Sequence, residues 1–135
     1  MFAVVDTGPL YAAVDADDAD HERCLAALET KGLRLVLPAM VVAEATYLIG
    51  SRLGAKVEAE FLRSLTEFDV AVPDPADWLR IAELVRRYGD FPLGGTDAAV
   101  VALAERLKTD LVITLDRRHL QAVRPRHCKS LRLLP

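Results

Sequence analysis

The sequence predicts an α/β fold in which helices cover both faces of a parallel sheet. Short apolar segments, of which 2–5 and 111–115 are the clearest, alternate with longer segments whose apolar residues recur at helical spacing. Unbroken apolar strands are typical of parallel sheets that are buried on both faces. With 135 residues, 52% of them hydrophobic, the chain is expected to form one domain over residues 1–135, because domains usually span about 100–200 residues.

The individual elements follow from apolar spacing and from the residues that end each segment. Strands are predicted at 2–5, 35–37, 70–72, 111–115 and 131–134, and residues 6–9 are predicted as a turn because they include Gly8 and Pro9. Helices are predicted at 20–29, 38–53, 55–68, 75–88 and 97–107, with a short one ending near 123. Thr96 is expected to cap the 97–107 helix. The inward face of the 75–88 helix is predicted to hold Trp78, Leu79, Ile81, Ala82 and Val85.

Composition excludes several classes of protein. No apolar stretch approaches the about 20 residues needed to cross a bilayer, and the N-terminus shows no secretory signal. Two cysteines form no disulfide framework, so a cytoplasmic location is expected. The net charge is −3, yet all the charged residues after Asp116 are basic. This tail is either a phosphate-binding surface or a solvated face.

Four acidic residues stand out by their positions. Asp6 and Asp116 each follow a buried strand, so both carboxylates project into one crevice if those strands are neighbours, although turns also favour Asp. Glu44 lies in an almost wholly apolar helix, where a buried carboxylate needs a partner; alternatively, it lies on the solvated stripe of that helix. Asp97 falls in the first turn of its helix, where the helix dipole alone explains an acid.

A divalent cation is the simplest reason for four acids to converge. Carboxylates placed together repel one another unless a cation lies between them, and Mg2+ and Mn2+ are bound through carboxylates, waters and phosphate oxygens. Such an ion lowers the pKa of bound water and stabilises charge on phosphoryl oxygens. The pattern therefore favours hydrolysis of a phosphodiester.

Four short motifs, spread over the whole chain, resemble those of PIN-domain nucleases. They are Val4-Val5-Asp6-Thr7, Val41-Val42-Ala43-Glu44, Gly95-Thr96-Asp97-Ala98 and Ile113-Thr114-Leu115-Asp116. More narrowly, the chain resembles the VapC-type toxins of bacterial toxin–antitoxin pairs. The resemblance implies a three-layer α/β/α sandwich with the sheet order 3-2-1-4-5, which places the first and fourth strands side by side.

The same resemblance implies a site and an activity. It implies that Asp6, Glu44, Asp97 and Asp116 form a catalytic site for Mg2+ or Mn2+, supported by Thr114 and Thr7. It also implies endonucleolytic cleavage of a structured RNA such as tRNA or rRNA, homodimerisation, and inhibition by a cognate antitoxin. Arg117 and Arg118, beside the expected site, either guide phosphates or are simply solvated side chains. Many relatives carry a further acid where this chain has these arginines and His119, so the number of ions stays open.

Other interpretations of the sequence compete with this one. The chief alternative is a catalytically inactive PIN-like module that binds RNA or a protein. A zinc site would draw on His21, Cys24, His127 and Cys128, but adjacent His127 and Cys128 are awkward ligands for one ion. The acidic segment 15–20 lacks the Gly and terminal Glu of a calcium loop. A receiver-type phosphoacceptor domain would require an acidic pair after the first strand, where this chain has Asp6 alone.

Overall fold

The computed structural model describes all 135 residues, and its centre is a five-stranded sheet whose strands all run parallel. The strands are β1 (Phe2–Val5), β2 (Arg34–Pro38), β3 (Asp69–Ala71), β4 (Leu111–Ile113) and β5 (Arg132–Leu134). Their order is β3-β2-β1-β4-β5, which confirms the predicted topology. Because the order reverses between β1 and β4, the carboxyl ends of these two strands open into a crevice, the usual ligand site of such sheets.

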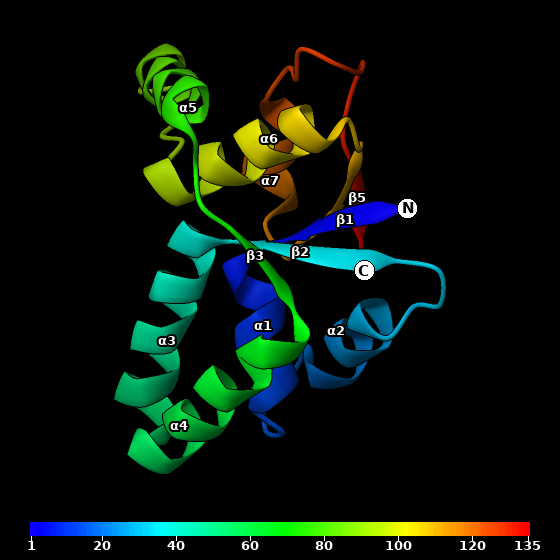
Figure 1. Cartoon of the computed structure of the whole chain (residues 1–135), viewed down its shortest axis with the longest axis vertical. Coiled ribbons are helices and arrows are strands. Elements are labelled where there is room, and N and C mark those ends of the chain that lie inside the picture. Colours follow the sequence, from blue (N-terminus) through cyan, green and yellow to red (C-terminus); the bar gives the residue numbers. More distant parts are fainter.

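Seven α-helices cover the sheet. They are α1 (Thr7–Val14), α2 (His21–Leu28), α3 (Ala39–Leu53), α4 (Ala55–Ser64), α5 (Pro75–Arg87), α6 (Gly95–Leu107) and α7 (Arg117–Ala122), and a short 3-10 turn, η1 (Leu65–Glu67), follows α4. Helices α1 to α4 lie on one face of the sheet and α5 to α7 on the other (Figure 1). The three-layer sandwich expected from the sequence is therefore confirmed.

Helix α6 packs deep in the fold and carries one side of the crevice. All of its residues from Ala98 to Ala104 are buried, and it contacts β1, β2 and β4. A helix that is apolar on every side belongs in the interior. The first turn of α6 contains Asp97 and lies at the carboxyl ends of β1 and β4. Asp97 lines the same cleft as Asp6 and Asp116, the residues that follow these two strands.

The first prediction that was wrong is the turn at residues 6–9. These residues begin α1, and Asp6 caps it by accepting a hydrogen bond from the Thr7 N–H at 2.8 Å. Pro9 is tolerated in the first turn because its missing N–H has no partner there in any case. Thr7, Pro9, Leu10, Tyr11 and Ala12 are all buried, so α1 lacks the polar stripe that makes a helix recognisable in a sequence.

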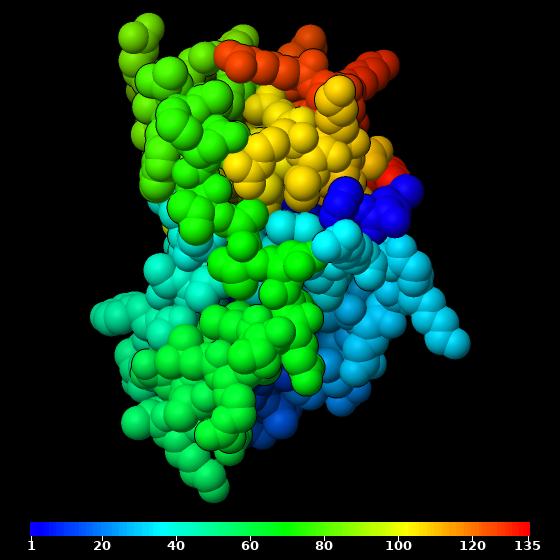
Figure 2. Space-filling view, viewed as in Figure 1, coloured from blue at the N-terminus to red at the C-terminus, as the bar shows by residue number.

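Two further predictions were wrong at α5 and α6. Trp78 and Leu79 are 49% and 76% exposed, and Ala82 is exposed too, whereas α5 buries Arg80, Ile81 and Leu84. This helix lies at the surface beside α6 (Figure 2). Thr96 does not cap α6, because the helix begins at Gly95, two residues before the predicted start, and Gly94 occupies the capping position without a side-chain hydrogen bond.

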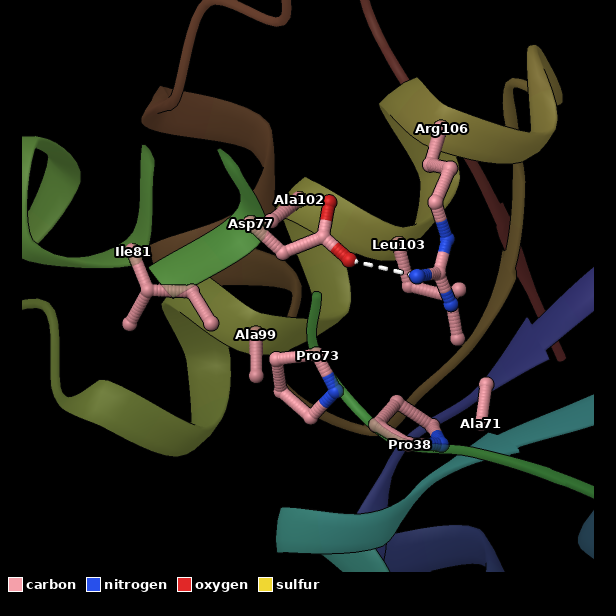
Figure 3. A pocket seen from close by; sticks show the side chains of 9 residues that line it. All are labelled: Pro38, Ala71, Pro73, Asp77, Ile81, Ala99, Ala102, Leu103 and Arg106. Carbon is pink, nitrogen blue, oxygen red and sulfur yellow. Dashed lines mark ion pairs between the residues drawn. The ribbon is translucent and has the colours of Figure 1, made fainter. Parts of the chain in front are cut away.

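A small hollow lies where the ends of β2 and β3 meet α5 and α6 (Figure 3). Pro38, Pro73 and Ile81 are among its apolar walls, and an ion pair between Arg106 and Asp77 at 2.7 Å borders it. It encloses about 10 Å³, enough for a single water molecule. The hollow is a small packing gap between the sheet and the layer formed by α5 and α6.

No helix of the chain is both long and apolar enough to span a membrane.

Candidate metal centre

The four predicted acids line one open cleft at the carboxyl ends of β1 and β4. The cleft has a volume of about 420 Å³, and we call it the acidic cleft. Its lining residues are Asp6, Thr7, Gly8, Glu44, Leu48, Asp97, Leu115 and Asp116. Asp6 follows β1, Glu44 lies on α3, Asp97 lies in the first turn of α6, and Asp116 precedes α7. The fold thus brings together side chains that are more than a hundred residues apart in the chain.

Thr114 links the first and last of these acids. Its hydroxyl donates to Asp6 Oδ2 at 2.8 Å, and its Oγ1 accepts the backbone N–H of Asp116 at 2.9 Å. The Thr7 N–H donates to the other oxygen of Asp6. Asp6 and Thr114 are 6% and 1% exposed, so the Asp6 carboxylate is held by two donors and cannot turn freely.

Burial and mutual repulsion make this cleft unfavourable for negative charge. Burial, and then the charges of Asp6 and Asp116, raise the pKa of Asp97 to about 6. These effects outweigh the helix dipole, which favours an acid in the first turn of α6. Burial also raises the pKa of Asp6; the hydrogen bonds from Thr114 and Thr7 oppose this shift, and the charges of Glu44 and Asp116 add to it. A cation in the cleft would relieve this repulsion.

Glu44 differs from the other acids because it is exposed at the mouth of the acidic cleft. Its position on α3 combines the two alternatives raised by the sequence: it lies on the solvated side of its helix, and it also faces the other carboxylates across the cleft. The apolar neighbours that suggested burial, Val41 and Ala45, point into the core instead.

The chemistry of the lining residues fits a hard divalent cation. All the ionisable groups that line the cleft are carboxylates, the ligand type that Mg2+ and Mn2+ prefer. The hydroxyl oxygen of Thr7, which belongs to the same lining, is buried without a hydrogen-bond partner. Buried polar atoms rarely lack a partner, and a hydrated ion in the cleft would offer one.

His119 is a neighbour of the site that was not predicted as functional. Asp97, Asp116 and His119 each offer a ligand atom, and these atoms all lie within 4.8 Å of one another. The available signal was the spacing of His119, which comes three residues after Asp116 and so lies one helical turn away.

The two arginines expected to guide phosphates have different surroundings. The Arg117 guanidinium donates to the carbonyl oxygens of Leu133 and Pro135, so it is already hydrogen-bonded to the C-terminal end of the chain. The Arg118 guanidinium lies over the ring of Phe91, 5.6 Å from its centroid. Both side chains are exposed at the start of α7, next to the acidic cleft.

The four residues weighed for zinc do not form one site, although Cys128 Sγ lies 3.6 Å from His127 Nε2. His21 contacts the carbonyl oxygen of Ala12 at 2.7 Å, and His127 contacts that of Thr109 at 2.7 Å. The group of Asp97, Asp116 and His119 is the one set of three or more potential ligands whose atoms all lie within 4.8 Å of one another, and neither cysteine belongs to it.

Comparison with known proteins supports the same family along most of the chain. The PIN domain family matches residues 3–124. Ribonuclease VapC26 of Mycobacterium tuberculosis is 37% identical over 124 residues, which cover 90% of this chain and 92% of the relative.

Solved structures share the fold at lower identity. The VapC20 toxin of Mycobacterium tuberculosis, described as cleaving the sarcin-ricin loop, aligns with a TM-score of 0.79 and 19% identity over 87% of this chain and 92% of that one. VapBC2 of Rickettsia felis, bound to a promoter DNA fragment, gives a TM-score of 0.74 and 14% identity over 100% of both chains. FitAcB of Neisseria gonorrhoeae gives 0.61 and 21%, over 86% of this chain and 88% of that one.

Proposed function

Because this chain belongs to the PIN-domain family, we propose that it is a metal-dependent endoribonuclease and the toxin of a type II toxin–antitoxin pair. The observation that carries the proposal is the acidic cleft, where Asp6, Glu44, Asp97 and Asp116 line one opening at the switch point of the sheet. The 37% identity to a ribonuclease over most of both chains supports the same activity.

Each acid has its own part in the proposed site. Asp6, Asp97 and Asp116 would hold Mg2+ or Mn2+, and Asp6 is already oriented by the Thr7 N–H and the Thr114 hydroxyl. When bound, such an ion lowers the pKa of water and neutralises charge on phosphate oxygens. Glu44 is exposed at the mouth of the cleft, so we assign it the role of orienting the attacking water on the substrate side.

The RNA substrate and the protein partners belong to the same proposal. We assign Arg118 to binding the phosphates of the RNA backbone, because arginine side chains commonly make such contacts. Arg117 would join it if RNA displaced the carbonyl oxygens of Leu133 and Pro135 from its guanidinium. A cognate antitoxin partner is supported by solved relatives that are toxin–antitoxin complexes. A homodimer is part of the proposal, and the neighbouring Trp78 and Leu79 on α5 leave apolar side chains exposed that could serve it. Both cysteines are free, which suits a reducing cytoplasm.

The proposal predicts cleavage of structured RNA that depends on added metal. Protein freed of any antitoxin and dialysed against chelator should cut ribosomal or transfer RNA when Mg2+ or Mn2+ is added, and should stop when excess chelator is supplied. Mapping the new RNA ends on a sequencing gel measures this directly. Glu44→Gln should leave the fold undisturbed because Glu44 is exposed. Its cleavage rate should fall at least about 10-fold, the lower end for residues that support a metal site.

Glu60→Gln is the matched control, since Glu60 is also an exposed helical glutamate but lies outside the acidic cleft. It should cut at the wild-type rate. If the wild-type protein binds RNA yet leaves it intact at every metal concentration, the inactive PIN-like module is the better description. If cleavage continues in excess chelator, the metal-dependent mechanism is wrong.

A further inference from the structure

Two donors of His119 converge on the Asp116 carboxylate. The backbone N–H of His119 donates to Asp116 Oδ1 at 3.1 Å, which caps α7. The ring Nδ1 of the same residue lies 2.8 Å from Oδ2 and 2.9 Å from Oδ1. An ionised carboxylate only accepts hydrogen bonds, so Nδ1 must carry the hydrogen and act as the donor.

The imidazole ring is itself held from another part of the fold. Phe91 meets it edge to face, with ring centroids 4.8 Å apart and an interplanar angle of 80°, an arrangement that aromatic pairs favour. Phe91 belongs to the segment between α5 and α6, where its N–H donates to the Tyr88 carbonyl at 3.1 Å. The ring of His119 therefore connects α7, which follows Asp116, to the segment that leads into α6 and Asp97.

The Asp116 carboxylate is held mainly by His119, whereas the Asp6 carboxylate is held by donors from two different residues. Asp6 is almost fully buried and its two oxygens are held separately by Thr7 and Thr114. The side chain of Asp116 is 35% exposed, and its carboxylate receives hydrogen bonds from only two donors, the backbone N–H and the ring Nδ1 of His119. Without the imidazole, the carboxylate would keep one backbone donor and could rotate toward solvent.

We propose that His119 is a positioning residue of the metal centre, whose ring N–H holds the Asp116 carboxylate in the orientation that receives the ion, with Phe91 fixing the ring. This inference rests on the proposed function, because it requires that Asp116 binds metal. Hydrogen-bond partners of metal-binding carboxylates typically contribute about 10–100-fold to metal affinity or activity.

The test is a calorimetric titration of the intact protein with Mn2+ in the absence of RNA. His119→Ala keeps the backbone cap but loses the ring donor, so its affinity for Mn2+ should fall by about 10–100-fold. His119→Asn restores an N–H donor close to the position of Nδ1 and should recover most of the affinity. Gln121→Ala, an exposed change on the same helix, is the matched control and should bind like the wild type. A melting curve for each variant confirms that it is folded.

Each outcome separates this inference from the proposed function. If the wild type binds Mn2+ and His119→Ala binds it equally well, the positioning role is wrong while the nuclease proposal stands. If the wild type binds no Mn2+, the proposed metal centre itself is wrong. If His119→Asn stays as weak as His119→Ala and pulsed electron paramagnetic resonance of the wild-type Mn2+ complex shows direct coupling to a histidine nitrogen, His119 is a ligand and the positioning role is overturned.

Discussion

Replacing Asp97 by Asn is expected to abolish RNA cleavage while making the metal-free protein more stable. The carboxylate is partly buried near Asp6 and Asp116, and both burial and these charges raise its pKa to about 6. A neutral amide of the same shape removes that repulsion. Cleavage should fall by more than about 100-fold, beyond the 10–100-fold typical of residues that only support metal ligands.

The gain in stability should depend on pH in a defined direction. The pKa of Asp97 is about 6 when folded against 3.8 when unfolded, so the folded protein holds more protons between these values. The free energy of unfolding of the wild type therefore decreases as pH rises through this window. In chelator, Asp97→Asn should melt a few degrees above the wild type at pH 7.5, since about 1 kcal/mol shifts Tm by roughly 2–8 °C, and the difference should be smaller at pH 5.

Asp90→Asn is the matched control, because Asp90 is exposed in the loop before α6. It should change neither cleavage nor the melting temperature. An Asp97→Asn protein that melts below the wild type in chelator would contradict the repulsion described here, and one that still cuts RNA at the wild-type rate would remove Asp97 from the mechanism.

Removing Arg80 is expected to have the largest effect on stability. Its side chain is 8% exposed and forms a two-point contact with Glu105, itself 10% exposed, at 2.8 and 3.0 Å. This pair joins α5 to α6, the helix that carries Asp97. Arg80→Ala leaves Glu105 buried with the backbone N–H of Arg126 as its remaining partner. Breaking one side of a buried pair costs about 3–5 kcal/mol, which chemical denaturation will measure.

The surface pair of Arg34 and Asp69 supplies the comparison. Its atoms lie 2.7 Å apart, but the two side chains are 68% and 50% exposed. Arg34→Ala should therefore change the free energy of unfolding by at most about 1 kcal/mol. Equal effects of the two substitutions would show that burial does not set the contribution of the Arg80 pair.

The strands could be predicted from sequence more reliably than the helices at the surface. Strands β1 and β4 are unbroken apolar runs, and the structure places both in the middle of the sheet. Helix α1 was missed because it is buried on most sides and contains Pro9 in its first turn. The inward face of α5 was misassigned because Arg80 is buried by its ion pair with Glu105, while Trp78 and Leu79 are exposed. The spacing of apolar residues does not reveal that a charged residue such as Arg80 lies on the buried face of a helix.

The acids of the cleft could be anticipated because three of them lie where an element begins or ends. Asp6, Asp97 and Asp116 each occupy such a position, and the parallel sheet brings these positions to one edge. The contribution of Thr114 came only from the family resemblance, and the structure gives it a physical basis through its bonds to Asp6 and Asp116. The contact of His119 with Phe91 could not be predicted from sequence, because the two residues are far apart in the chain and share no helix or strand.

We propose that Asp6, Asp97 and Asp116, which lie far apart in the chain, together hold one divalent ion in the acidic cleft. Crystals soaked in Mn2+ and measured at a wavelength where manganese scatters anomalously test it most directly. We predict an anomalous peak between Asp6, Asp97 and Asp116, and its loss in the Asp97→Asn variant. A cleft that stays empty at saturating Mn2+, or a peak bound only elsewhere on the surface, would contradict the account.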